Sequence, residues 1–169
     1  MIFEKQILKF YKNKIFTRCD NPLGIFYFSK DDYLNLTQEP FAFKSSKGHT
    51  LQGYFYHYPN YDKKRIIIFE HGFGNGHRAY MTEIEKLCNQ GYRVFTYDHT
   101  GCMESGGEST NGFAQSLVDL NDAINALKQN PQTKMTSFSV IGHSWGAYST
   151  LNIVALHPNI NQIVAISGY

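Results

Sequence analysis

Apolar and polar positions divide the chain into two regions with different periodicity. After residue 60, four apolar runs without alternation are separated by stretches with helical spacing; the runs are RIIIFEH, YRVFTYD, SFSVIGHS and QIVAISGY. Strands that are apolar on both faces are typical of a mostly parallel sheet covered by helices on both faces. The pattern predicts an α/β fold, and we expect residues 1–169 to form a single domain because no repeat or linker divides them.

The first 58 residues follow other patterns. Residues 1–16 place apolar side chains near helical spacing, which predicts a short amphipathic helix packed on the domain. A helix lying on a membrane surface fits the same spacing and stays open as the alternative. Residues 41–58 contain two extended runs around Lys47-Gly48, and this arrangement predicts a β-hairpin.

Charge and cysteine content narrow the classes of function. The net charge of +2, from 16 basic and 14 acidic residues, is too small to indicate a phosphate-backbone partner, so no nucleic acid is expected. Cys19, Cys88 and Cys102 have no metal-ligand spacing and do not suggest a disulfide framework, which favours a reducing compartment and a cytoplasmic protein. We expect no membrane span, since no stretch has roughly 20 apolar residues, and we expect no signal peptide.

The strongest chemical signal is the pentapeptide Gly142-His143-Ser144-Trp145-Gly146, between a predicted strand and a predicted helix. A G-x-S-x-G turn in this context holds a serine at the carboxyl end of the strand, and its two glycines let strand and helix approach closely. The hydroxyl then projects at the N-terminus of a helix, where free N–H groups favour developing negative charge. Ser144 is therefore the predicted catalytic nucleophile.

A second signal, His71-Gly72-Phe73-Gly74, follows directly after the run RIIIFE. Acyl transfer passes through a tetrahedral oxyanion that needs two backbone N–H donors, one after the nucleophile and one from this loop. We expect these donors to be the N–H groups of Trp145 and Phe73. A plain Gly-rich turn would explain the glycines, but not their occurrence ahead of a G-x-S-x-G turn.

The segments HGFG, YDHTGCMESGG and GHSWG together resemble the α/β-hydrolase superfamily, in particular its serine aminopeptidase-like and monoglyceride lipase-like branch. The resemblance runs from about residue 41 to residue 169. It implies an N-terminal antiparallel hairpin followed by parallel strands, with the serine on the fifth strand and QIVAISGY as the sixth. It also implies hydrolysis of a carboxylic ester or amide through an acyl-enzyme on Ser144, with His71 as an orienting residue. That chemistry requires no metal and no organic cofactor.

The chain departs from the family pattern in two places. Relatives usually read Asp-x-x-Gly-x-Gly-x-Ser after the fourth strand, whereas Met103 replaces the second glycine here. The triad order is serine, acid, histidine, but no Asp or Glu follows Ser144 and His157 is the only later histidine. A helix over residues 145–157 would place His157 about 18–20 Å from the serine. We therefore expect a fold truncated after the sixth strand and a fragment with weak or no activity.

Upstream residues offer few substitutes for the absent acid and histidine. His71 stays open as an alternative base because it lies beside the expected oxyanion loop. His143 is disfavoured because adjacent strand residues point to opposite faces. Asp98, Glu104 and Asp119 precede the serine, so using one of them would break the family order.

Three other hypotheses fit parts of the sequence. Residues 74–79 match the dinucleotide fingerprint G-x-G-x-x-A, with an acidic residue about 20 positions further on, but this does not explain the G-x-S-x-G turn. A non-catalytic hydrolase-like binding protein or pseudoenzyme remnant would fit the missing acid and histidine. A metal site is the weakest idea, because the spacing matches no ligand pattern; its candidates are His71, His77, Asp98 and His99.

The predicted partner is a small-molecule ester or amide substrate. The edge of the sixth strand is expected to expose apolar surface, and an unpaired strand edge invites association with another chain. Association through this open sheet edge is therefore a further prediction.

Overall fold

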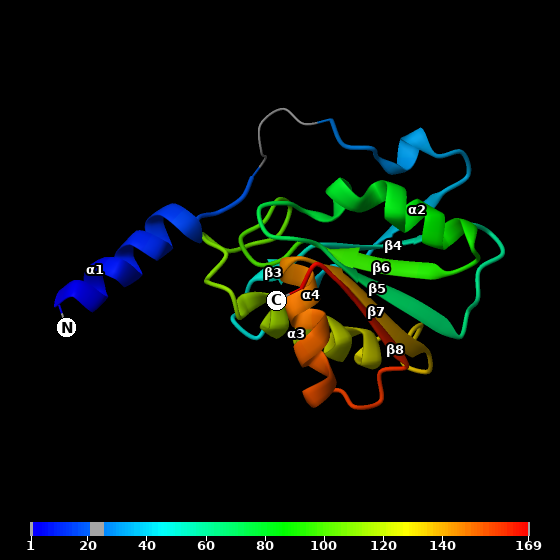
Figure 1. The fold of residues 1–169 in the computed structure, drawn as a ribbon. Coiled ribbons are helices and arrows are strands. Elements are labelled where there is room, and N and C mark those ends of the chain that lie inside the picture. Colours follow the sequence, from blue (N-terminus) through cyan, green and yellow to red (C-terminus); the bar gives the residue numbers. More distant parts are fainter. Residues whose placement is uncertain (1, 21–25, 169) are drawn as a thin grey trace.

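The computed structural model describes residues 2–20 and 26–168, which surround one mixed sheet (Figure 1). In the described part of the chain this sheet has six strands in the spatial order β1-β4-β6-β5-β7-β8. Their bounds are β1 (Thr37–Pro40), β4 (Gly53–His57), β5 (Arg65–Glu70), β6 (Arg93–Tyr97), β7 (Ser137–His143) and β8 (Gln162–Ile166). β4 pairs antiparallel with β1 and β6, and the other pairs are parallel. The predicted mostly parallel sheet is confirmed, with Ser144 after its fifth strand and β8 as its sixth.

Helices cover both faces of the sheet, as the apolar strands predicted. α2 (Met81–Asn89) lies on one face, and α3 (Gln115–Gln129) and α4 (Trp145–Asn152) lie on the other (Figure 1). Ile66 and Ile68 of β5 pack with residues of α3, whereas Ile67 and Phe69 pack with residues of α2. A strand that is buried on both faces has no side facing water, which explains why apolar and polar residues do not alternate along it. Short helical turns complete the fold: η2 (Lys30–Asp32), η3 (His77–Tyr80) and η4 (Ile153–Ala155).

The hairpin predicted over residues 41–58 is correct only in part. β2 (Phe43–Lys44) and β3 (Thr50–Leu51) form a small separate antiparallel pair. The second extended run continues into β4, which pairs with β1 and β6 in the main sheet. β4 carries Phe55 and Tyr56 on opposite faces, and both are buried, which a two-stranded hairpin could not achieve.

The N-terminal segment is helical, but it does not pack on the domain. α1 (Ile2–Phe10) continues into the π-helical turn η1 (Tyr11–Ile15), and Figure 1 shows α1 extending away from the sheet. Phe3 and Leu8 are 79% and 64% exposed, so the expected packing is wrong. The faces of the sheet beside α2 and α3 already have their own helices, which leaves this segment attached through residues 16–20. Met1, the first residue of the predicted helix, lies outside the described residues.

β8 is an edge strand of the sheet. Among the described residues it pairs with β7 alone, and all five of its residues are exposed. The expectation of exposed apolar surface at this edge is confirmed by Ile163, Val164 and Ile166, whereas association through it stays a prediction. Tyr169, the end of the predicted sixth strand, lies outside the described residues. Over residues 2–20 and 26–168, no helix combines the length and apolar character needed to cross a bilayer.

Candidate active site

Ser144 lies at the sharp turn between β7 and α4. Its backbone has φ 54° and ψ −113°, a combination that residues with a Cβ rarely adopt. The Ser144 N–H donates to the Ile166 carbonyl at 2.9 Å, and the Ser144 carbonyl accepts the Ala147 N–H at 3.0 Å. The turn therefore holds the residue at the carboxyl end of the parallel strands and at the start of α4.

The two glycines of the pentapeptide are required by close approach. A Cβ added to Gly142 would lie 2.2 Å from the Gly146 carbonyl oxygen. A Cβ added to Gly146 would lie 2.4 Å from the Glu70 carbonyl oxygen. Side-chain carbons essentially never come within 3.0 Å of such atoms, so glycine at both positions lets β7, α4 and β5 meet.

The loop after β5 lies directly beside the serine. A Cβ on Gly72 would be 3.4 Å from the Ser144 Cβ and 2.7 Å from the Tyr80 hydroxyl. Gly74 has φ +76°, a left-handed conformation that glycine adopts without strain. Gly72 is therefore needed for space and Gly74 for its backbone conformation.

His71 is buried beneath this loop, and both of its ring nitrogens contact backbone groups. Nε2 accepts the His99 N–H at 3.0 Å, so Nδ1 carries the proton and donates to the Gly72 carbonyl at 2.8 Å. Burial lowers the pKa of His71 to about 3, which keeps the ring neutral near neutral pH. This geometry suits a residue that shapes the loop, and it gives no support to the alternative in which His71 is the base.

Phe73 and Trp145, whose backbone N–H groups are the predicted oxyanion donors, lie next to one another. Their rings meet edge to face with centroids 5.2 Å apart. Within the described part of the chain, neither backbone N–H donates a hydrogen bond. The Gly72 N–H, by contrast, donates to the Tyr80 hydroxyl at 3.0 Å. The two predicted donors are therefore among the N–H groups of these turns that donate no hydrogen bond.

The Ser144 hydroxyl forms no hydrogen bond with a described residue. The His143 Nδ1 faces the Tyr80 hydroxyl at 2.8 Å. His157 contacts Lys128 at 2.9 Å and Asn121 at 3.0 Å, at the far end of α4 and η4. Neither histidine is joined to the serine, in agreement with the expectation for each.

A buried ionic cluster behind the nucleophile turn was not found from the sequence. His99 lies between two carboxylates, with Nε2 3.5 Å from Glu70 Oε2 and Nδ1 3.5 Å from Asp119 Oδ2. All three side chains are buried, and the His99 ring centroid is 4.8 Å from that of Trp145. The signal in the sequence was Glu70, a charged residue at the end of the apolar run that forms β5. Charged side chains are rarely fully buried unless they are paired, so this position indicated a partner.

Burial and charge act in opposite directions within this cluster. Burial raises the pKa of Glu70 to about 7, more than the nearby His99 lowers it. Burial also opposes the charged form of His99, but the facing carboxylates outweigh it and raise the His99 pKa. The folded chain therefore retains protons here that an unfolded chain would release.

An N-terminal strap, defined as residues 16–20, fastens the loop after β6. The Arg18 guanidinium donates to the carbonyls of Ser105 and Gly107 at 2.8 Å and to that of Met103 at 2.6 Å. Met103 has φ 40°, in the left-handed region that favours the glycine usual in relatives. The replacement by methionine has thus kept a glycine-like backbone, held in place by the strap.

The same strap also contacts the loop that carries Phe73. The Cys19 thiol donates to the Gly74 carbonyl at 2.9 Å, and the Phe16 ring lies edge to face with the Phe73 ring at 5.9 Å. Sequence analysis missed these contacts because they join residues more than fifty positions apart. The strap therefore links the N-terminal segment to the candidate oxyanion loop.

Arg18→Ala is expected to lower the free energy of unfolding by about 2 kcal/mol, because three carbonyls lose a charged donor that is only partly exposed. Urea unfolding measures the loss, and hydrogen exchange of the 103–107 amides should accelerate. Arg18→Lys keeps the charge but not the fork of donors, so it should lose about half as much. An alanine variant within about 0.5 kcal/mol of the parent would contradict the strap's role.

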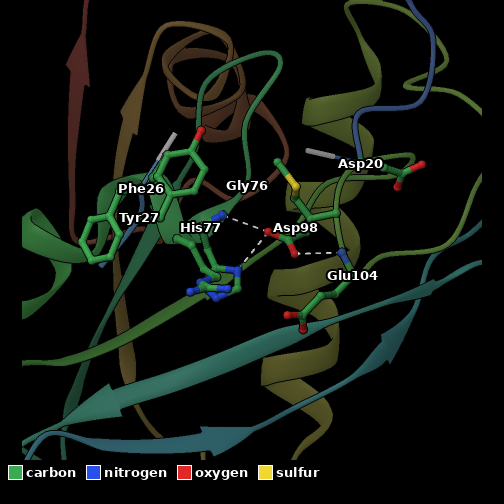
Figure 2. A pocket seen from close by; sticks show the side chains of 10 residues that line it. Asp20, Phe26, Tyr27, Gly76, His77, Asp98 and Glu104 are labelled. Carbon is green, nitrogen blue, oxygen red and sulfur yellow. Dashed lines mark hydrogen bonds and ion pairs between the residues drawn. The ribbon is translucent and has the colours of Figure 1, made fainter. Parts of the chain in front are cut away.

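Neither the dinucleotide hypothesis nor the metal hypothesis, both of which use Asp98, is supported by the contacts of this residue. His77 and Asp98 line a cavity of about 490 Å³. Their side chains point at each other (Figure 2). Asp98 Oδ1 accepts the His77 N–H at 2.8 Å and contacts its Nδ1 at 2.9 Å, while Oδ2 accepts the Glu104 N–H at 3.2 Å. Asp98 is fully buried and already has three such partners, which disfavours it as the acceptor of a ribose hydroxyl. In the described ranges no three His, Cys, Asp or Glu side chains gather as metal ligands.

Comparison with known proteins gives matches over most of the chain. The family described as Serine aminopeptidase, S33, matches residues 61–169. The uncharacterized protein YqkD from Bacillus subtilis (strain 168) is 26% identical over 162 residues, covering 93% of this chain and 50% of YqkD. The structure of the Pyrococcus furiosus esterase Pf2001 is similar with a TM-score of 0.75 and 25% identity, covering 88% of this chain and 58% of that chain.

A thermostable carboxyl esterase from Bacillus coagulans has the same fold, with a TM-score of 0.62 and 21% identity. The alignment covers 75% of this chain and 43% of that esterase. This chain thus spans about half the length of the proteins it is similar to.

Proposed function

The chain belongs to the serine aminopeptidase S33 family of α/β-hydrolases, and from this premise we propose that it hydrolyses a carboxylic ester or amide through an acyl-enzyme on Ser144. The observation that carries the proposal is the strained conformation of Ser144, φ 54° and ψ −113°, beside two N–H groups without partners. Strain of this kind marks functional positions, because the surrounding structure must maintain it.

In the acylation step, the Ser144 oxygen forms a bond to the substrate carbonyl carbon while its proton passes to a base. The carbonyl oxygen becomes an oxyanion, which the Phe73 and Trp145 N–H groups are placed to receive. Collapse of this intermediate expels the alcohol or amine, which takes up the proton, and water later releases the acid. The positive end of α4 adds to the stabilisation of the oxyanion.

No described residue forms a hydrogen bond with the Ser144 hydroxyl, and His143 and His157 contact other partners. We therefore propose that the triad acid and histidine belong to a further part of the protein or to a second polypeptide. Alone, this chain is expected to hold a nucleophile that is only weakly active.

The experiment compares a fluorophosphonate probe on this chain, on Ser144→Ala and on Ser137→Ala, with p-nitrophenyl butyrate hydrolysis alongside. Imidazole is added as a dissolved substitute for the missing base, since a positioned base contributes about 10²–10⁴-fold. We expect slow labelling that imidazole accelerates in the parent and in Ser137→Ala, and that Ser144→Ala abolishes. Ser137 is an exposed serine at the start of β7, so its variant controls for loss of any serine.

Each other result would revise the proposal. Fast Ser144-dependent turnover without imidazole would mean that a base exists within these residues, and the external acid and histidine would be unnecessary. Labelling that persists in Ser144→Ala would assign the nucleophile to another residue. A folded chain that stays unlabelled even with imidazole would favour the non-catalytic binding protein.

A further inference from the structure

The N-terminal helix carries a large exposed apolar surface. α1 and η1 together span residues 2–15. Six apolar side chains on them are between 41% and 79% exposed: Phe3, Ile7, Leu8, Phe10, Tyr11 and Ile15. These six side chains form the apolar stripe. Contiguous apolar surface of this kind marks an interaction site more often than an ordinary solvated face.

The two lysines of α1 lie opposite most of its apolar side chains, whereas Glu4, four residues before Leu8, lies among them. Phe3, Ile7 and Tyr11 recur every four residues and therefore lie along one side. Lys5 and Lys9 recur with the same spacing on the opposite side, and both are exposed. A helix with one apolar side and one lysine-bearing side fits a boundary between an apolar and an aqueous medium.

In the part of the chain that the structure describes, the apolar stripe stays exposed. Figure 1 shows α1 extending away from the sheet and its helices. Contacts with the domain begin at the strap, where Phe16 meets Phe73 and Arg18 binds the loop after β6. The helix is thus fastened at one end and accessible along its length.

We propose that α1 and η1 bind the surface of a negatively charged lipid bilayer. The apolar stripe enters the boundary between headgroups and acyl chains, where the rings of phenylalanine and tyrosine bind well. The lysines at positions 5, 9 and 14 outnumber the single carboxylate Glu4, so the segment has a net positive charge that attracts anionic headgroups. A second copy of the chain would cover the stripe but would bring the same excess of lysine over carboxylate to it, so charge complementarity favours the bilayer. The proposal does not depend on the hydrolase activity.

The test measures cosedimentation of the 169-residue chain, in a Ser144→Ala background, with vesicles of two compositions. One contains phosphatidylcholine alone, and the other contains about one quarter phosphatidylserine. We expect binding to the anionic vesicles to be about 20-fold tighter, and to weaken between about 0.1 M and about 0.5 M salt as screening increases.

Three double variants separate the contributions. Ile7→Gln with Phe10→Gln removes two apolar anchors while keeping good helix formers, and should weaken binding at least about 100-fold. Lys5→Gln with Lys9→Gln should remove most of the preference for anionic vesicles. Gln6→Asn with Asn13→Gln changes neither apolarity nor charge and should bind like the parent. Circular dichroism checks that every variant is folded.

Three outcomes would overturn the proposal. Equal binding to both vesicle types would show that negative charge is not recognised. Parent-like binding by the Ile7→Gln and Phe10→Gln variant would show that the apolar stripe is not the binding surface. Absence of binding by the folded chain, together with a dimer that this variant converts to a monomer, would assign the stripe to contacts between copies.

Discussion

Gly146→Ala is expected to lower the free energy of unfolding by about 3 kcal/mol or more, enough to unfold much of a marginally stable chain. The added Cβ would lie 2.4 Å from the Glu70 carbonyl oxygen and 2.6 Å from its carbonyl carbon. Both are backbone atoms of a central strand, so neither can rotate away. α4 would have to move from β5, which would also displace Ser144. Urea unfolding gives the loss of stability, and the fluorophosphonate probe shows whether Ser144 has moved.

Gly48→Ala is the matched control. Gly48 has φ +85°, and a Cβ there would meet nothing within 4 Å. Its alanine variant therefore carries backbone strain without a clash, and should lose only about 1 kcal/mol. Equal losses at the two positions would mean that close approach is not what requires glycine at 146.

His99→Leu is expected to cost about 3–5 kcal/mol, because it leaves two buried carboxylates without their cation. Glu70 Oε2 accepts the Tyr97 and Ser149 hydroxyls at 3.2 and 3.1 Å, whereas Glu70 Oε1 has no hydrogen-bond partner among the described residues. Asp119 also accepts the Thr100 N–H and hydroxyl, at 2.7 and 2.8 Å. His49→Leu, at a partly exposed histidine, controls for loss of an imidazole and should stay within about 0.5 kcal/mol of the parent.

The stability of the parent should fall as the pH rises, in a direction set by the raised pKa values. A group whose folded pKa is raised contributes stability at low pH, and this contribution disappears as the pH rises through the folded value. Glu70 has its pKa raised from 4.5 to about 7, and the His99 pKa is raised above 6.5. The Glu70 contribution should therefore disappear between about pH 4.5 and about pH 7, and the His99 contribution should disappear as the pH rises above 6.5. His71, whose pKa is lowered from 6.5 to about 3, acts in the opposite direction below pH 6.5.

The measurement is the free energy of unfolding across this pH range, for the parent, Glu70→Gln, His99→Leu and the double variant. Glu70→Gln should flatten the pH dependence. The double variant should be more stable than His99→Leu, because a neutral amide needs no cation and still accepts from Ser149. A double variant that loses the full sum of the single losses would show that Glu70 and His99 act independently.

Local signals in the sequence predicted the nucleophile turn and the order of strands. The G-x-S-x-G motif is a short local pattern, although the close approach at Gly146 is to Glu70 of another strand. The apolar runs predicted buried strands of a mostly parallel sheet, because helices on both faces leave such strands no polar face. Each of these signals is carried by residues that lie close together in the chain.

What the sequence did not predict depends on contacts between distant residues. β1 pairs with β4, and β4 leaves the predicted hairpin, because the main sheet buries Phe55 and Tyr56 better than two strands could. Arg18 meets carbonyls more than eighty positions away, and no periodicity encodes such a contact. The spacing of apolar side chains in α1 indicated that one face needs a partner, but amphipathicity does not say which partner.

The strained conformation of Ser144 also bears on how this sequence evolved. A glycine at position 144 would take φ 54° without steric conflict, so glycine would satisfy selection for stability alone. Serine there is the less stable choice, and its hydroxyl is what the chain gains in exchange. Chains of this family that have lost the need for a nucleophile should therefore drift toward glycine at this turn, while still conserving the flanking glycines. The identity of this one residue would then serve as a record of whether a lineage kept its chemistry.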